Sequence, residues 1–465
     1  MQDGVERTEE KSTKGHLHHG LPMVEQLDGA SLQKEIDTLR QINARSSRVS
    51  RWRGYWQLSG PGWLQSAVTL GAGSAASSIF AGSVFGYRML WVQPVSMFLG
   101  VMMFAAIGKQ ALVTRARPYD VFWKKLHPSV ALFWGFNVLL ASIVWQFPQY
   151  SLSTAVVGDI FDVFGVRLPK IVIAFLLLCV ATKICWGYGK GRRKSIVIFE
   201  RTMKYFVFVM VLAFLGVVIR TGVDWGELVK GYLGFYLPGD VRGLTIVLGA
   251  LGAAVGVNMT FLYPYTLLAR GWGKNHQGLK NFDLATNMFF PFVLATSLVI
   301  IATANTLHLR GIEVRNVIDV AHVLEPVVGV TLSRIVFSLG VLSMCLTTMV
   351  LEMLICGFVL SEMLHLEFRG NLYKITTMTA NIGILGAFYA MPFWLPVLTS
   401  SFNLIMLPVA YVGYFILQNR RDYLGQDVNT GVKGRVWNFI MLVAIAVVAL
   451  GALVKILTVS GVISG

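Results

Sequence analysis

The sequence predicts an all-α polytopic membrane protein with about eleven transmembrane helices. Hydrophobic residues occupy 55% of the 465 positions and charged residues only 14%, whereas soluble domains carry about 25% charged residues. The mean hydropathy is +0.62. Two of the apolar stretches are interrupted by small residues or proline, which indicates broken helices of the kind found in transporters.

The apolar stretches follow one another with short connections after a hydrophilic start. A helix needs about 20 residues to cross the hydrocarbon core, and each stretch has roughly that length. We place the spans at residues 58–86, 89–113, 129–160, 168–187, 195–219, 243–268, 283–306, 332–362, 372–389, 391–417 and 436–458.

Basic residues set the expected orientation. A surplus of Lys and Arg in cytoplasmic loops accounts for the net charge of +16 without a nucleic-acid partner. Residues 1–54 form a hydrophilic tail that is rich in arginine near its end, so we expect a cytoplasmic N-terminus and an integral protein of the cell (inner) membrane, surrounded by the lipid bilayer. Within this tail, Leu32, Ile36 and Leu39 share one side of a short amphipathic helix.

The first span is interrupted by a run of small residues, GAGSAASS, from Gly71 to Ser78. Glycine and serine are poor helix formers, so we expect the helix to unwind over this run. Unwound backbone at membrane depth is tolerated only where it lines a cavity or binds something. The alternative is a seam of small residues that lets helices pack closely, and the run alone leaves both interpretations open.

The sixth span has a glycine face and then Pro264, which we expect to break the helix because proline removes an internal hydrogen bond. Two interrupted spans lie five helices apart, which predicts a five-plus-five inverted repeat with broken helices 1 and 6 and a site between the breaks. We expect the first repeat at 55–220, the second at 241–418 and an extra eleventh helix at 436–460. Polar and aromatic residues surround the proline: Asn258, Thr260, Tyr263, Tyr265 and Thr266.

Several short patterns follow one another along the chain: GPGW at 60–63, GSVFGYRMLWV at 82–92, GRRK at 191–194 leading to Glu200, DWGELVKG at 224–231, Leu407-Pro408, and NRRDYLG at 419–425. Together, in this order, they resemble the NRAMP family of divalent-metal transporters. The resemblance covers roughly residues 55–460. It implies eleven helices in the five-plus-five fold and a mechanism of alternating access.

The resemblance also implies which positions form the site, and there this chain lacks each of the family's acidic, amide, Met and His side chains. The family has an Asp-Pro-Gly-Asn motif in the first break and Met-Pro-His in the sixth span, followed by a further His. It also has an acidic pair in the third span and an amide in the tenth. The corresponding residues here are Gly71, Ala72, Gly73 and Ser74; Tyr263, Pro264 and Tyr265; Arg270; Gln149 and Leu152; and Ser400.

These departures alter the chemistry that we expect. Hard cations prefer carboxylates, and soft ones prefer thioether, imidazole or thiolate ligands. Proton coupling needs a group that titrates near neutral pH. We therefore expect an NRAMP-related transporter with a carboxylate-free site, suited to a hydrated divalent cation such as Mg²⁺, with weak or no proton coupling. The alternatives are a transporter of a small neutral or cationic organic solute, or a non-transporting membrane sensor or scaffold.

The candidate substrate-binding residues come from both breaks and from the tenth span: Gly71, Ala72, Gly73, Ser74, Ser77, Asn258, Thr260, Tyr263, Tyr265 and Ser400. A polar or charged pathway adds Gln149, Arg270 and Glu352; the last lies well inside the eighth span, where a charge indicates function unless a base pairs with it. The ligands of any metal stay undetermined. We expect no enzyme activity, no cofactor and a monomer.

Overall fold

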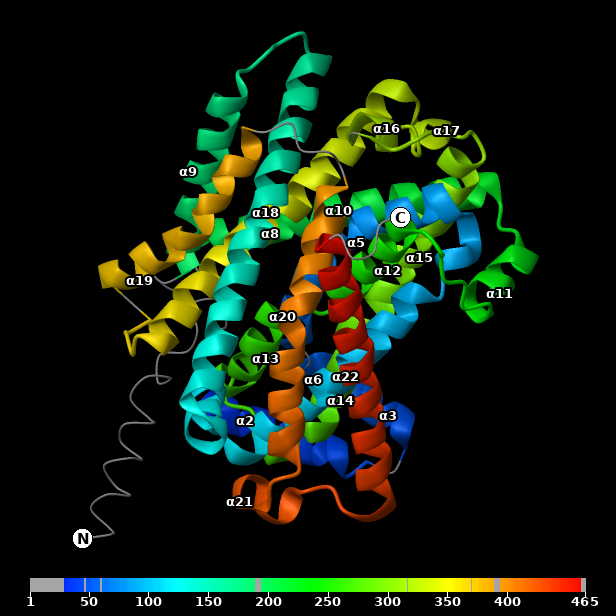
Figure 1. The fold of residues 1–465 in the computed structure, drawn as a ribbon. Coiled ribbons are helices and arrows are strands. Elements are labelled where there is room, and N and C mark those ends of the chain that lie inside the picture. Colours follow the sequence, from blue (N-terminus) through cyan, green and yellow to red (C-terminus); the bar gives the residue numbers. More distant parts are fainter. Residues whose placement is uncertain are drawn as a thin grey trace.

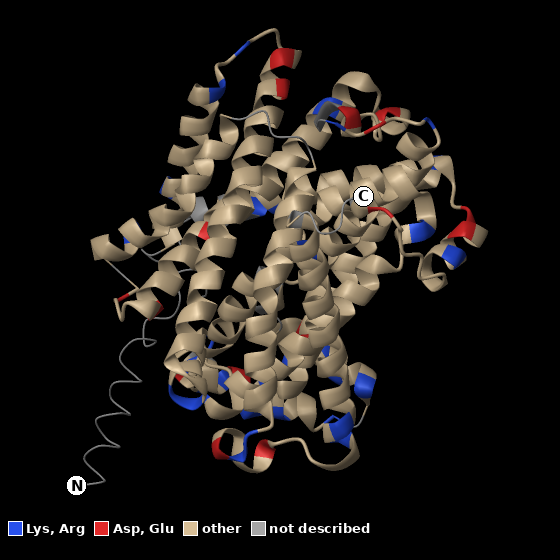
Figure 2. Ribbon diagram, in the orientation of Figure 1, with Lys and Arg blue, Asp and Glu red and all other residues tan. Residues whose placement is uncertain are grey.

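The computed structural model describes residues 29–45, 47–58, 61–188, 194–315, 317–368, 370–388 and 394–460. Helices are the regular elements throughout these ranges (Figure 1). The predicted span boundary at 389–393 and the basic run at 191–193 lie outside the described residues, as does most of the hydrophilic tail. Lys and Arg gather at the end of the molecule that carries α2, α3, α14 and α21, here called the lower end (Figure 2). The upper end carries α11, α16 and α17.

The helices have the following bounds. The first half of the chain forms α2 (Gly29–Asn43), α3 (Arg48–Leu58), α4 (Pro61–Thr69), α5 (Ala72–Phe85), η1 (Gly86–Met89), α6 (Val92–Thr114), α7 (Pro118–Val121), η2 (Phe122–Leu126), α8 (Pro128–Val163), α9 (Lys170–Tyr188), α10 (Lys194–Thr221) and α11 (Trp225–Leu233). The second half forms α12 (Val241–Ala254), α13 (Val257–Ala269), η3 (Lys274–His276), α14 (Gln277–Leu284), η4 (Ala285–Phe289), α15 (Phe290–Thr303), η5 (Ala304–His308), α16 (Val317–Ala321), α17 (Glu325–Val328), α18 (Val330–Met363), α19 (Gly370–Thr377), η6 (Met378–Ala387), α20 (Leu395–Gln418), α21 (Arg421–Leu424), η7 (Gly425–Asp427) and α22 (Gly431–Val459).

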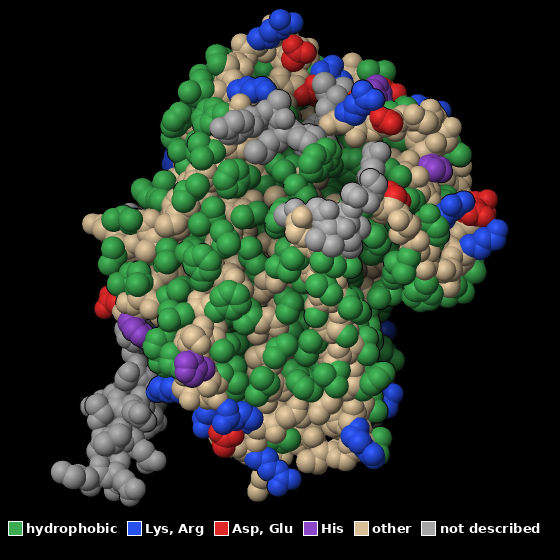
Figure 3. Space-filling model, in the orientation of Figure 1, with side chains coloured by type: hydrophobic (Ala, Val, Ile, Leu, Met, Phe, Trp, Pro, Cys, Tyr) green, Lys and Arg blue, Asp and Glu red, His purple; other side chains and the backbone are tan. Residues whose placement is uncertain are grey.

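The predicted fold class is confirmed. Within the described residues, 9 helices are long and apolar enough to cross a membrane. The predicted spans 58–86 and 372–389 are formed by shorter helices in series, α4 with α5 and α19 with η6. Apolar side chains cover the middle of the face seen in Figure 3, and charged side chains lie toward its two ends. This distribution is that of a protein with a lipid-facing belt.

The first span is broken, but over a shorter stretch than the sequence suggests. α4 ends at Thr69 and α5 begins at Ala72, so only Leu70 and Gly71 separate the two helices. The predicted unwinding through Ser78 is therefore wrong. The serine hydroxyls after the break donate to carbonyls three or four residues earlier, as in the 2.8 Å bond from Ser78 to the Ser74 carbonyl. Their polar atoms are thus satisfied inside a continuous helix.

The sixth span is also broken, at a different residue from the predicted one. α12 ends at Ala254 and α13 begins at Val257, whereas Pro264 lies inside α13. The expectation that this proline breaks the helix is wrong. A proline leaves the carbonyl four residues earlier without its helical donor, and here the hydroxyl of Tyr414 lies 3.4 Å from the Thr260 carbonyl and donates to it. The helix therefore continues through the proline.

The two broken spans lie side by side and run in opposite directions. α5 contacts α12 and α4 contacts α13, and Figure 1 shows α5 and α12 nearer the upper end. The helices α8, α18 and α20 pack around them. The breaks are thus enclosed by the interior faces of three long helices.

The predicted amphipathic helix of the tail is confirmed as α2. Leu39 and Ile42 are buried in the main apolar core. The carboxylate of Glu35 accepts a 2.7 Å hydrogen bond from Nε1 of Trp272, which follows α13. The helix is therefore docked on the lower end through both apolar and charged contacts.

Candidate functional site

Small residues after the first break give neighbouring helices room to approach. A Cβ on Gly73 would lie 2.1 Å from the ring of Trp145 in α8 and 2.7 Å from Oγ of Ser400 in α20. A Cβ on Gly249 of α12 would lie 3.4 Å from Oγ of Ser77. The run of small residues is therefore a close-packed seam as well as the flank of a break. Its packing brings the predicted residues Gly73, Ser77 and Ser400 into one region.

A carboxylate reaches the second break from a neighbouring span. Nδ2 of Asn258 donates a 2.7 Å hydrogen bond to Oε1 of Glu352 in α18. Both residues are 1% exposed, and Asn258 lies two positions after Gly256 of the break. The residues of the two breaks carry no carboxylate, as the sequence predicts, but α18 brings one to them.

The same helix also reaches the first break. Oγ1 of Thr348 lies 3.1 Å from the position that a Cβ would take on Gly71. Thr348 and Glu352 are four residues apart and therefore share one face of α18. That face borders both breaks.

Other predicted residues are buried in packing or local hydrogen bonds. The hydroxyl of Thr260 donates to the Val257 carbonyl at 2.6 Å. Tyr263 packs against Phe104 with ring centroids 5.0 Å apart, and its hydroxyl has no hydrogen-bond partner among the described residues. Gln149 is fully buried in α8, and neither atom of its amide has a partner in the described structure.

Two predicted residues belong to the lower end instead of the breaks. The hydroxyl of Tyr265 donates to Oε2 of Glu362 at 2.7 Å and accepts from the backbone N–H of Tyr119 at 3.1 Å. The guanidinium of Arg270 lies 3.9 Å from Glu35 in α2. These side chains hold helices together at the lower end.

The network around Glu362 closes the lower end with charged groups. Arg117, in the connection after α6, forms an ion pair with Glu362 near the end of α18. Burial raises the pKa of the nearby Tyr119 to about 12, with the Glu362 and Asp120 carboxylates adding to the effect. This tyrosine therefore stays neutral at physiological pH.

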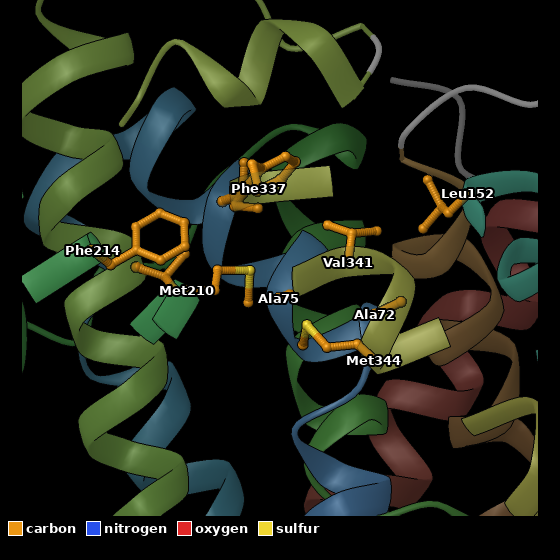
Figure 4. Close-up of a pocket in the computed structure, with 10 residues that line it drawn as sticks. Ala72, Ala75, Leu152, Met210, Phe214, Phe337, Val341 and Met344 are labelled. Carbon is orange, nitrogen blue, oxygen red and sulfur yellow. The ribbon is translucent and has the colours of Figure 1, made fainter. Parts of the chain in front are cut away.

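A small cavity lies beside the first break but has no ligand-binding chemistry. Its volume is about 20 Å³, and it is lined by apolar side chains from α5, α8, α10, α15 and α18. Figure 4 shows Ala72 and Ala75 of α5 together with Met344, Val341 and Phe337 of α18. A cavity of this size holds about one water molecule and offers it no polar partner. We assign it to imperfect packing.

A larger cavity of about 620 Å³ lies on the upper side of the breaks, and we call it the upper vestibule. Phe80 of α5, Ile246 of α12 and Val397 of α20 contribute to its lining, as does the buried side chain of Lys455. Val397 would meet a Cβ on Gly249 at 2.5 Å, next to Ser77. On α5 the lining residue Phe80 lies seven positions after Gly73, which is about two helical turns.

The sequence missed several residues that surround the breaks. The ring of Trp145 lies against Gly73, and Ser142 of α8 lies beside Glu352. Neither residue carries a pattern that predicts its position, because each is one of many residues in an ordinary apolar span. Within the described residues, no group of three or more His, Cys, Asp or Glu side chains could hold a metal ion.

Comparison with known proteins identifies relatives over most of the chain. A family model described as "Natural resistance-associated macrophage protein-like" matches residues 62–458. The divalent metal cation transporter MntH of Granulibacter bethesdensis is 23% identical over 410 residues, which is 84% of this chain and 87% of that protein. MntH of Nostoc is 23% identical over 442 residues, which is 88% of this chain and 93% of that protein.

Solved structures share the fold. A mutant of the manganese transporter of Eremococcus coleocola has a TM-score of 0.71 at 14% identity, covering 95% of this chain and 90% of that one. MhsT in complex with L-phenylalanine has a TM-score of 0.54 at 13% identity, covering 84% of this chain and 98% of that one. At these identities the likeness establishes the architecture alone.

Proposed function

Because this chain belongs to the natural resistance-associated macrophage protein family, we propose that it moves a divalent metal cation across the membrane by alternating access. The MntH relatives are divalent metal cation transporters. The two broken spans that face each other provide a place where a cation can meet backbone carbonyls at membrane depth.

The preferred cation is a hard one that keeps part of its water shell, with Mg²⁺ as the first candidate. The observation that carries this choice is the side-chain chemistry of the breaks. Leu70 and Gly71 in the first and Val255 and Gly256 in the second provide no charged or soft ligand. Mg²⁺ loses its water reluctantly and needs only one or two carboxylates besides water, and Glu352 of α18 brings one carboxylate to the second break. The family positions that would supply soft ligands are occupied by Tyr263 and Tyr265, which also favours weak or absent proton coupling.

The conformation supports a cycle with two access states. The upper vestibule approaches the breaks from one side, while Tyr265 and Arg117 both bind Glu362 on the other side. The positive charge of the lower end favours a cytoplasmic location for that end and for the N-terminus. The upper vestibule then opens outward. We take the single chain, a monomer in the cell membrane, as the unit that transports.

Uptake by the purified full-length protein in proteoliposomes tests this function. We expect uptake of Mg²⁺ that exceeds uptake of Mn²⁺ and changes little when a pH gradient is imposed. Empty liposomes and an organic cation such as choline serve as controls. Strongly proton-driven Mn²⁺ uptake that is abolished by Ser74→Ala or Tyr263→Ala would instead restore the ordinary family site. Uptake of choline alone would favour an organic substrate.

A further inference from the structure

The Asn258–Glu352 pair has an unused ligand atom. Oε1 of Glu352 accepts the hydrogen bond from Asn258, but Oε2 has no hydrogen-bond partner among the described residues. The hydroxyl of Ser142 lies beside the same carboxylate, near enough to interact with it. Leaving part of a buried carboxylate unpaired is destabilising. Such a group inside a span therefore indicates that a ligand completes it.

The second break is shaped around the asparagine that holds this carboxylate. Oδ1 of Asn258 accepts a 2.9 Å hydrogen bond from the backbone N–H of Met259. This bond fixes the carboxamide with its Nδ2 toward Glu352. A Cβ on Gly256 would lie 2.4 Å from Oδ1 of Asn258. Glycine at this position thus makes room for the carboxamide, and the carboxylate is held in a defined orientation.

The position of Glu352 along α18 places it between both breaks. One turn earlier on the same face, Thr348 approaches Gly71 of the first break. A carboxylate at the second break and a hydroxyl at the first are therefore set by a single rigid helix. Ligands held on a helix are positioned more accurately than ligands held on loops.

We propose that the ionised carboxylate of Glu352, oriented by Asn258, binds the transported divalent cation. This inference rests on the proposed function and names the charged ligand of the same site. Here the carboxylate comes from the eighth span, while the positions of the first break that match the family's motif carry none. One carboxylate together with neutral oxygens suits a hard, partly hydrated cation such as Mg²⁺ and gives little advantage to a soft one.

Binding of MgCl₂ to the purified full-length protein in detergent tests the assignment. The readout is the rise in melting temperature with Mg²⁺ concentration, because a ligand that binds only the folded state stabilises it by mass action. Choline chloride at equal ionic strength corrects for salt. We expect the rise in the wild type and none in Glu352→Gln. The neutral amide of this variant still accepts the hydrogen bond from Asn258 and removes the buried charge. Without cation, the variant should therefore melt at or above the melting temperature of the wild type.

Three further variants separate ligation from structure. Glu352→Asp keeps the negative charge on a side chain that is shorter by one methylene. The affinity for Mg²⁺ should fall by on the order of tenfold but should remain measurable. Asn258→Leu removes the orienting donor and should weaken binding by about tenfold. Glu35→Gln makes the same chemical change at a buried carboxylate of α2, far from the breaks, and should keep the wild-type response.

The outcomes distinguish this assignment from the proposed function. If Glu352→Gln keeps the Mg²⁺-dependent rise and the Mg²⁺ uptake of the wild type, the assignment of Glu352 is wrong and the transport function stands. If the wild type neither binds nor takes up Mg²⁺ or Mn²⁺, the proposed function is wrong and the assignment falls with it. Loss of binding in Glu352→Gln together with partial recovery in Glu352→Asp supports both.

Discussion

The phenol of Tyr265 donates a 2.7 Å hydrogen bond to Oε2 of Glu362, and this bond joins the lower half of the broken sixth span to the end of α18. The other oxygen of Glu362 is occupied by Arg117. Because the glutamate is nearly inaccessible to solvent, water cannot readily replace the bond from Tyr265 if α13 moves away from α18. The pair is therefore a lock on the lower end.

Tyr265→Phe should release this lock. A hydrogen bond to a charged group contributes about 1.5–3 kcal/mol, so the ratio of lower-closed to lower-open molecules should fall by roughly tenfold or more. Labelling of Ser74→Cys by an impermeant thiol reagent from the lower side, in a variant without the four native cysteines, measures the change. Tyr411→Phe is the control, since it removes a hydroxyl that does not contact Glu362. Equal labelling rates in both variants would show that Tyr265 does not control access.

Docking of α2 should depend on Glu35. Glu35→Ala removes the hydrogen bond to Trp272 and the contact with Arg270, which weakens docking by roughly 1.5–3 kcal/mol. Hydrogen–deuterium exchange of Gly29–Asn43 should then rise by more than about tenfold. Gln33→Ala, which removes only an exposed contact with Asp37 within the helix, should leave exchange nearly unchanged. Similar exchange rates in the two variants would show that the packing of Leu39 and Ile42, and not Glu35, provides most of the docking energy.

Close backbone contact between α12 and α20 should make Gly252 intolerant of a side chain. A Cβ there would lie 2.0 Å from the carbonyl oxygen of Ser400, and a backbone atom cannot rotate away. Gly252→Ala should destabilise the protein by about 1–3 kcal/mol, the usual effect of overpacking. Thermal unfolding in detergent measures it. Gly158→Ala in α8 is the control, because its Cβ would meet only Ile173 at 3.8 Å; a loss of stability there equal to that of Gly252→Ala would contradict the packing argument.

The loop around α21 should loosen in acid. The carboxylate of Asp422 accepts hydrogen bonds from Arg420 and Lys125, and these bonds lower its pKa from the ordinary value of 3.8. A lowered folded-state pKa means that the ionised group stabilises the loop above about pH 4, and that this contribution is lost as the pH falls through the lowered value.

Hydrogen–deuterium exchange of Arg421–Leu424, corrected for the intrinsic pH dependence of exchange, measures this effect. Protection in the wild type should decrease with acid, whereas Asp422→Asn should be less protected at neutral pH and should show little further change. Identical pH profiles for the two proteins would mean that the loop is held by its other contacts.

Local patterns in the sequence were sufficient to predict the spans and the presence of two breaks, because hydropathy and small residues act over a few neighbouring positions. The exact break in the sixth span depends on distant residues. Pro264 is accommodated because Tyr414, 154 positions after Thr260, supplies a donor to the Thr260 carbonyl. No local rule could indicate this compensation.

The residues that form the site also depend on contacts between distant parts of the sequence, which local patterns do not reveal. Glu352 could be recognised as an unusual charge inside a span, but its contact with Asn258 spans 94 positions. The motif positions of the first break suggested a site without any carboxylate. Only the packing of α18 against both breaks brings one there. Tyr265 was assigned to the site because it adjoins Pro264 and matches a family site position, and Arg270 to the pathway because it matches the family's further His. Their partners hold both side chains at the lower end.

One buried carboxylate has an electrical consequence. If Glu352 is ionised, the empty site carries one negative charge, and a bound divalent cation changes the net charge of the site to plus one. The membrane potential, which is worth about 2.3 kcal/mol per elementary charge per 100 mV, then acts in opposite directions on the empty and the loaded carrier. In the proposed cycle, a voltage that drives the loaded protein inward also drives the empty protein back outward, so both halves of the cycle respond to the same gradient.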